Sequence, residues 1–128
     1  MKLSVLFIIT AVYGFLFGLP LLLAPDAIAA MAGATLDPQM AMQMRYMGVA
    51  FLGLGIIAWL ARNSDASKAR DALTMGFFIF FVLSALTSLY AQFTPAAMAT
   101  DWVYVVIQAL LAVGFWVVGR ANMSTSKS

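Results

Sequence analysis

Arg45 is the residue most able to do chemistry in a sequence that is otherwise strongly apolar. It precedes Arg62 by 17 residues within one apolar stretch, a separation of about 26 Å along a helix. Two arginines at that spacing cannot both lie outside a hydrocarbon layer roughly 30 Å thick. If Arg62 lies at one interface, Arg45 lies at the opposite edge of the hydrocarbon, where an unpaired guanidinium costs up to about 3 kcal/mol. Arg45 is therefore expected to have a partner.

The expected partner of Arg45 is a carboxylate, because a guanidinium binds a carboxylate through two parallel hydrogen bonds. Asp101 is the first choice, and Asp26 and Asp37 are the other acids expected on that side. Two alternatives stay open, in which the Arg45 side chain extends to lipid phosphates or contacts a ligand. The candidate contacts for a ligand or partner are Arg45, Tyr46, Asp101, Tyr104 and Gln108.

Gln108 is the second polar residue that needs a partner. It lies about two turns inside the last apolar stretch, and an amide at that depth requires a hydrogen bond. Arg45 and Ser88 are the candidate partners. A structural role in joining two helices is expected, because interhelical hydrogen bonds of this kind contribute about 0.6 kcal/mol each.

The residue types that are missing exclude several classes of function. Cysteine and histidine are absent, which removes thiolate catalysis, disulfide exchange, and thiolate or imidazole ligation of metals and haem. Glutamate is also absent, and no apolar stretch offers the lysine that a serine nucleophile would need as a base. The net charge of +2 is scattered, unlike the basic face of a nucleic-acid-binding protein. The sequence predicts no enzyme activity, no cofactor, no metal site and no nucleic-acid partner.

Four long apolar stretches must position the polar residues. Hydrophobic residues make up 64% of the chain and charged residues 9%, whereas a soluble domain has about 25% charged residues. Each stretch is close to the 20 or so residues that a membrane-spanning helix needs. We predict an all-α integral membrane protein, a four-helix bundle forming a single domain over residues 1–121. The spans are expected at residues 3–23, 38–62, 70–93 and 101–120, followed by a short polar tail at 122–128.

Prolines and capping residues predict where the helices begin and end. Asp37 is expected to cap the second span, with Pro38 at its first position. Pro95 is expected to stop the third span, and the hydroxyl of Thr100 to cap the fourth. The segment from Pro25 to Gly33 is expected to be a short apolar turn.

The basic residues predict the orientation of the chain. Four crossings place six of the seven Lys and Arg residues on one side, namely Lys2, Arg62, Lys68, Arg70, Arg120 and Lys127. Because positive loops stay in the cytoplasm, both termini are expected to be cytoplasmic, in a bacterial inner membrane. The alternative is a signal peptide cleaved near Ala27, but the first apolar stretch is longer than the usual 7 to 15 residues or so of such a peptide.

Glycines at helical spacing predict close helix packing. Gly48, Gly55 and Trp59 share one face of the second span with Arg45, since they follow it in steps of three and four through Leu52. In lipid, glycines let neighbouring backbones approach closely, which substitutes for the hydrophobic effect. The residues expected at helix contacts are Gly14, Gly18, Gly48, Gly55 and Trp59. A run of four phenylalanines in the third span, Phe77, Phe78, Phe80 and Phe81, is expected to face lipid or fill the core.

The second span also carries a family resemblance. Arg45-Tyr46-Met47-Gly48 opens it, Gly53 and Gly55 follow, and Trp59-Leu60-Ala61-Arg62 closes it. This layout resembles small bacterial four-helix membrane proteins similar to the DoxX-like group. The resemblance implies an accessory subunit of a quinone-linked oxidoreductase or a helper of disulfide chemistry. The absence of cysteine departs from the second role, and the first would need a partner that carries the cofactor.

The sequence therefore predicts a non-catalytic accessory subunit or scaffold that packs in a larger membrane complex. Its expected partners are membrane lipids and either other membrane subunits or a second copy of the chain. The alternative is a binder or carrier of a small lipid or apolar molecule, held in an outward-opening cavity near Arg45. A subunit should leave a glycine-containing or aromatic helix face without a partner in the monomer, whereas a binder should enclose an apolar pocket.

Overall fold

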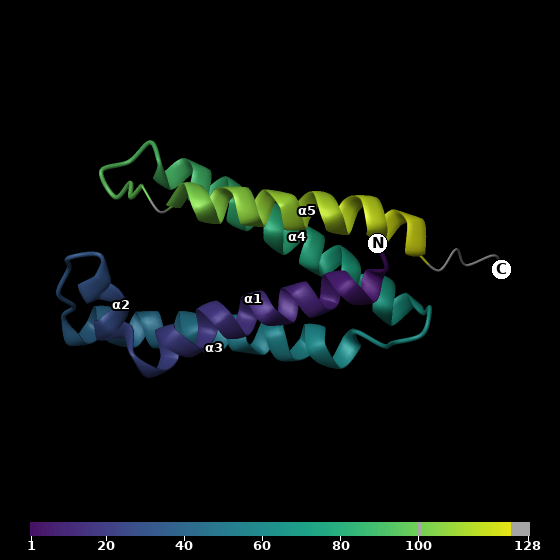
Figure 1. The fold of residues 1–128 in the computed structure, drawn as a ribbon, viewed down its shortest axis with the longest axis horizontal. Coiled ribbons are helices and arrows are strands. Elements are labelled where there is room, and N and C mark those ends of the chain that lie inside the picture. The colour runs from purple at the N-terminus through teal and green to yellow at the C-terminus, as the bar shows by residue number, and fades with distance from the viewer. Residues whose placement is uncertain (100, 124–128) are drawn as a thin grey trace. The chain divides into compact units, whose positions relative to one another are not determined.

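The computed structural model describes residues 1–99 and 101–123, which form an all-α fold with five helices. They are α1 (Leu3–Leu23), α2 (Pro25–Met31), α3 (Pro38–Ala61), α4 (Lys68–Ala91) and α5 (Asp101–Asn122). All except α2 are long and apolar enough to cross a membrane (Figure 1). Four such helices indicate a multi-pass membrane protein.

Side-chain caps account for where α3 and α4 begin. The Asp37 carboxylate accepts a hydrogen bond from the Met40 backbone N–H at 2.8 Å, and proline follows at the first helical position, as expected. Ser67 caps α4 in the same way, accepting from the Arg70 backbone N–H at 3.2 Å. That cap starts α4 at Lys68, two residues before the predicted start. The predicted cap of α5, Thr100, and most of the predicted polar tail lie outside the described residues.

The segment after α1 is a helix of its own rather than a turn. Pro25 occupies the first helical position of α2, where its missing N–H costs nothing. The helix ends in a reversal at Gly33, whose φ of 72° is a backbone conformation that glycine adopts without strain. The Ala34 backbone N–H closes this reversal by donating to the Ala29 carbonyl at 2.9 Å. The sequence prediction missed α2 because seven residues make barely two turns.

The chain divides into two compact units, each built on one pair of antiparallel helices. The α1–α3 unit contains residues Phe7–Arg62. The α4–α5 unit contains residues Met1–Leu6 together with the chain from Asn63 onward. In Figure 1, α1 and α3 run side by side in one pair, and α4 and α5 in the other.

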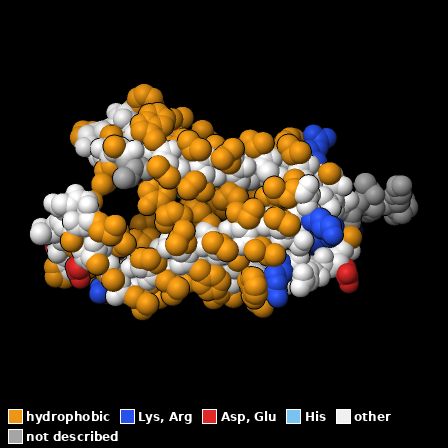
Figure 2. Space-filling model, in the orientation of Figure 1, with side chains coloured by type: hydrophobic (Ala, Val, Ile, Leu, Met, Phe, Trp, Pro, Cys, Tyr) orange, Lys and Arg blue, Asp and Glu red, His pale blue; other side chains and the backbone are white. Residues whose placement is uncertain are grey.

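Apolar side chains dominate the surface of the long helices. Figure 2 shows them across the middle of the helices on the visible face, with Lys and Arg toward the helix ends. Many large apolar residues are more than half exposed, among them Leu16, Tyr46, Leu60, Leu83, Tyr90, Leu110 and Val117. Such a surface is stable against lipid or against other apolar helices, and it is the expected exterior of a membrane protein.

Candidate functional site

The α1–α3 pair is held by glycines at which the two backbones almost touch. A Cβ atom built on Gly14 would lie 2.5 Å from the Phe51 carbonyl oxygen and 2.6 Å from the Gly55 Cα. One turn further along α1, a Cβ atom on Gly18 would lie 2.9 Å from the Gly48 carbonyl oxygen. Real Cβ atoms do not approach other atoms so closely, so only glycine fits at these positions. The structure thus places Gly14, Gly18, Gly48 and Gly55 together at one helix contact.

Trp59 differs from the other residues expected at this contact. Its side chain is 45% exposed, and the Arg62 guanidinium lies 3.7 Å from the centroid of its ring. The Arg62 side chain also donates a hydrogen bond to the Trp59 backbone carbonyl. Trp59 thus makes a cation–π contact at the end of its own helix, and its packing against another helix stays a prediction. The indole ring is too large for a face on which backbones meet.

Arg45 lies half-buried on α3, and its neighbour Tyr46 is 67% exposed. The Arg45 guanidinium makes one weak contact along its own helix, with the Met42 sulfur at 4.0 Å. The Asp101 carboxylate accepts a hydrogen bond from the Met98 backbone N–H at 3.0 Å. Because Arg45 and Asp101 belong to different units, their ion pair stays a prediction.

Gln108 joins the two helices of the α4–α5 unit. Its side chain is 6% exposed, and its Oε1 accepts a hydrogen bond from the Ser88 hydroxyl at 2.9 Å. Ser88 was one of the two partners that the sequence suggested. Tyr104, one turn earlier on α5, is half-buried. The bond satisfies a buried amide within the unit, which is a structural use of Gln108.

Aromatic rings fill the rest of the α4–α5 contact. Phe77 and Phe81 of α4 both stack on Phe115 of α5, with ring centroids 5.6 and 5.9 Å apart. Phe81 is 0% and Phe115 1% exposed, so these rings form the core of the unit. Phe78 lies beside them and tilts against Trp116 at 5.1 Å. The phenylalanine run is thus core filler on one side of α4, which was one of its two expected roles.

Arg70 joins α4 to α5 at the end of their contact that lies opposite Gln108. The Arg70 Nη2 donates a hydrogen bond to the Asn122 backbone carbonyl at 2.6 Å. That carbonyl belongs to the last turn of α5, where carbonyls lack partners within the helix and attract cations. One turn into α4, the Thr74 methyl would lie 2.7 Å from a Cβ built on Gly119, so a larger residue there would require the Thr74 side chain to move. The Arg70 contact was not predicted, because Arg70 was interpreted as a loop charge.

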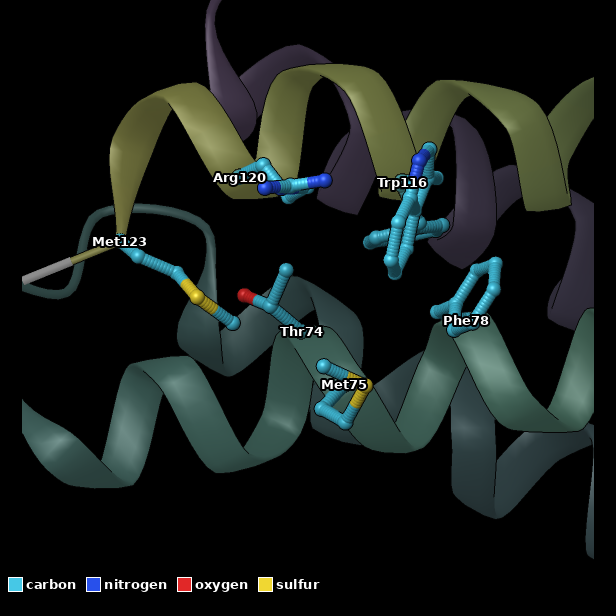
Figure 3. A pocket seen from close by; sticks show the side chains of 8 residues that line it. Thr74, Met75, Phe78, Trp116, Arg120 and Met123 are labelled. Atoms are coloured by element: carbon cyan, nitrogen blue, oxygen red, sulfur yellow. The ribbon is translucent and has the colours of Figure 1, made fainter.

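Two adjoining hollows lie along the surface between α4 and α5. One measures about 300 Å³ and is lined by Phe78, Val82, Ala112, Val113 and Trp116. The other continues toward the end of α5 past the same Phe78 and Trp116 (Figure 3); its further lining residues are Thr74, Met75, Phe115, Gly119, Arg120 and Met123. Neither hollow includes Arg45 or Gln108. Their walls are apolar except at Thr74 and Arg120.

The polar side chains described above make hydrogen bonds within and between helices. No three acidic residues gather at one place within residues 1–99 and 101–123. Two hydrogen bonds join one helix to the next, at Ser88 and Gln108 and at Arg70 and Asn122. Beside these contacts, the surface between α4 and α5 carries apolar hollows with Arg120 at one end.

The chain belongs to the family described as a domain of unknown function (DUF8292), whose model matches residues 4–127. That match spans all five helices. No curated protein and no solved structure matches the chain. The family description does not link the chain to the DoxX-like group, so that resemblance stays a prediction.

Proposed function

We propose that the protein is a non-catalytic membrane protein that serves as an accessory subunit or scaffold in a larger membrane complex. Composition supports the absence of catalysis, because histidine, cysteine and glutamate are all missing from the chain. The resemblance to DoxX-like proteins is part of this proposal. Under it, any redox cofactor would be carried by a partner subunit of the complex.

One surface of α3 carries the proposal. A stripe of exposed side chains follows α3 in steps of three and four, about 100° around the helix from the glycines that contact α1. Gly53 lies in the middle of this stripe, and no atom lies within 4 Å of a Cβ built there. The α3 stripe consists of Met42, Tyr46, Val49, Gly53, Ile56 and Leu60, of which the five large residues are 44–73% exposed.

The composition of the α3 stripe favours a protein partner. Helix association in lipid depends on small residues that let another backbone approach, and a mid-helix glycine otherwise costs helix stability of about 1 kcal/mol relative to alanine. The glycines facing α1 have that use within the chain, whereas Gly53 does not. A second helix, from another subunit or a second copy, would give Gly53 the same use.

The one-sided distribution of basic residues supports an orientation for the proposed subunit. Four crossings put on one side of the membrane Lys2, the segment from Arg62 to Arg70, and Arg120. The positive-inside rule makes that side cytoplasmic. We accordingly place both termini in the cytoplasm and the protein in a bacterial inner membrane. The exposed aromatic residues Tyr46, Tyr90 and Trp102 would then lie toward the opposite interface.

A bulky residue at Gly53 tests the proposal. The protein is extracted from its native membrane in mild detergent, and its mass is measured by size exclusion with light scattering and its partners by mass spectrometry. We expect the unmodified chain to run as a complex of fixed stoichiometry and Gly53→Leu to lose most of it. The thermal stability of the Gly53→Leu monomer should not fall, because the added side chain meets no atom of this chain.

Gly76→Leu is the matched control for that experiment. Gly76 lies on α4 with no atom within 4 Å of a Cβ, so the same substitution is made at a glycine that is equally open. The complex should survive it. A chain that runs as a monomer when extracted, or a complex that tolerates Gly53→Leu as well as Gly76→Leu, would contradict the proposed use of the α3 stripe.

A further inference from the structure

The two hollows between α4 and α5 form one groove that is apolar along its length and ends on a cation. The rings of Phe78 and Trp116 tilt against each other at 5.1 Å and line both hollows, so the two hollows adjoin at this ring pair. Val82, Ala112 and Val113 extend the groove toward the middle of the helices, and Arg120 stands at its other end, in the last turn of α5. We call this the α4–α5 groove. All of its lining residues belong to one unit.

Arg120 has its charge available to a ligand. Its side chain is exposed, and its guanidinium carbon lies 5.0 Å from the centroid of the Trp116 ring. That contact holds the guanidinium over the groove without using its N–H donors. Within the described part of the chain, Arg120 makes no hydrogen bond or ion pair. Arg70, the other arginine of this unit, is already bonded to the Asn122 carbonyl.

We propose that the α4–α5 groove binds an anionic phospholipid, with one acyl chain along Phe78, Val82 and Val113 and the phosphate at Arg120. The geometry follows the order of parts in a lipid, because the apolar walls lie toward the middle of the helices and the cation at the helix end. A guanidinium matches a phosphate with two parallel hydrogen bonds. An anionic headgroup is favoured over a zwitterionic one, because Arg120 has no counter-charge among residues 1–99 and 101–123 and a zwitterion brings a cation of its own.

A lipid suits the groove better than a partner helix. Helices that pack in membranes do so over small residues that let backbones approach. Here the groove is rimmed by the large rings of Phe78 and Trp116, and Ala112 is the one small residue in the apolar hollow of about 300 Å³. A flexible chain of methylenes can lie along the surface of this ring pair and of the apolar hollow beside it, whereas a helix about 10 Å wide cannot follow so narrow a surface.

Trp116 provides a direct measurement of what fills the groove, through quenching by brominated lipids. The variant Trp59→Phe/Trp102→Phe keeps Trp116 as the sole tryptophan of the full chain. It is reconstituted in zwitterionic vesicles that contain equal fractions of brominated phosphatidylglycerol or brominated phosphatidylcholine. We expect the anionic lipid to occupy the site with an advantage of about fivefold, the size associated with one basic residue at an anionic interface. Equal quenching by the two lipids would overturn the proposal.

The charge at Arg120 is tested by Arg120→Gln in the same background. In this variant, both brominated lipids should quench the fluorescence of Trp116 equally, because the lipid phosphate has lost its arginine partner. A matched control uses the other arginine–tryptophan pair, Arg62 and Trp59, in a chain that keeps Trp59 alone. That pair has similar chemistry but does not line the groove. If Trp59 shows the same preference and Arg62→Gln abolishes it, the effect is a general attraction to the interface, and the α4–α5 site is refuted.

The apolar part of the groove is tested by filling it. Val113 lines the groove, whereas Val117 lies one turn further along α5 and does not, and the two are 59% and 60% exposed. Val113→Phe should reduce quenching of Trp116 by the brominated anionic lipid, and Val117→Phe should leave it unchanged. If Trp116 is shielded from both brominated lipids in the unmodified groove, a protein segment fills it and the lipid proposal fails.

Discussion

The two helices within each pair of this protein are held together by different kinds of contact. In the α1–α3 pair the backbones meet at glycines, Gly14 against Gly55 and Gly18 against Gly48, beside one edge-on contact between the Tyr13 and Phe51 rings. In the α4–α5 pair the contact is made by large side chains, with Phe77 and Phe81 stacked on Phe115. The first pair should therefore fail when volume is added and the second when volume is removed.

The α4–α5 pair also uses side-chain hydrogen bonds. The Ser88 hydroxyl donates to Gln108, and Arg70 donates to the last carbonyl of α5. The α4–α5 groove lies at the surface of the same pair. In lipid, both solutions replace the hydrophobic effect, one by close van der Waals contact and the other by ring packing with hydrogen bonds.

The largest effect is expected from Gly14→Leu. A single Cβ at Gly14 already lies 2.5 Å from the Phe51 carbonyl oxygen, and leucine adds three more carbon atoms against backbone that has no room to move. Overpacking by one or a few methylenes costs about 1–3 kcal/mol, so we expect this variant to lose cooperative unfolding in detergent. Thermal melting followed by circular dichroism measures the effect.

The same substitution at a glycine of α5 serves as the control for Gly14→Leu. Gly114→Leu adds the same atoms to α5, where a Cβ would meet the Leu6 side chain at 3.0 Å rather than a backbone. A flexible side chain can move aside, so this variant should melt closer to the unmodified chain. If Gly14→Leu and Gly114→Leu melt alike, backbone contact is not what distinguishes the α1–α3 pair.

The second effect in size is expected from Phe115→Ala, which removes the ring on which both α4 phenylalanines stack. In soluble cores such a truncation costs about 3–5 kcal/mol. In a membrane, the rings stay surrounded by apolar lipid when the helices separate. The variant therefore loses only the contribution of ring packing to the free energy of unfolding, roughly 1–2 kcal/mol. Unfolding in a graded detergent mixture measures the difference. Phe93→Ala is the control, since Phe93 is 80% exposed, and an equal loss in both variants would remove Phe115 from the core.

Much of this arrangement was predictable from the sequence, and the exceptions have physical causes. The first span was predicted at residues 3–23 and α1 is Leu3–Leu23, because length and apolar composition alone define a lipid-crossing helix. The start of α3 followed from Asp37 and Pro38, which act locally. The glycine positions followed from helical spacing, because only a few positions on one face can meet another backbone.

The features that were not predicted depend on the pairing of helices. Which of four phenylalanines faces inward is set by how α5 lies against α4, and spacing along α4 does not contain that information. The Arg70 bond was missed because the first turn of α4 contains Lys68 and Arg70 and so resembled a loop. Trp59 shared the spacing of the glycines but is too large for their contact, and it lies 45% exposed.

The smallest effect is expected at the hydrogen bond between Ser88 and Gln108 of the α4–α5 pair. Ser88→Ala removes the hydroxyl that donates to Gln108 Oε1 at 2.9 Å, and Gln108→Leu keeps a similar volume while removing the amide. Gln108 has further interactions, so Gln108→Leu alone should cost more than Ser88→Ala. The double variant completes a cycle that isolates the pair.

The coupling energy in that cycle should be close to 0.6 kcal/mol, about the average for hydrogen bonds between helices in lipid, because the separated helices also find partners there. A value this small is measurable when all four chains are unfolded in the same detergent mixture. Coupling near zero would mean that the rings alone join α4 to α5, and the contrast between the two helix pairs would then be one of side-chain volume only. Coupling well above 1 kcal/mol would instead make the buried amide a main contact of the unit, with the rings as filler around it.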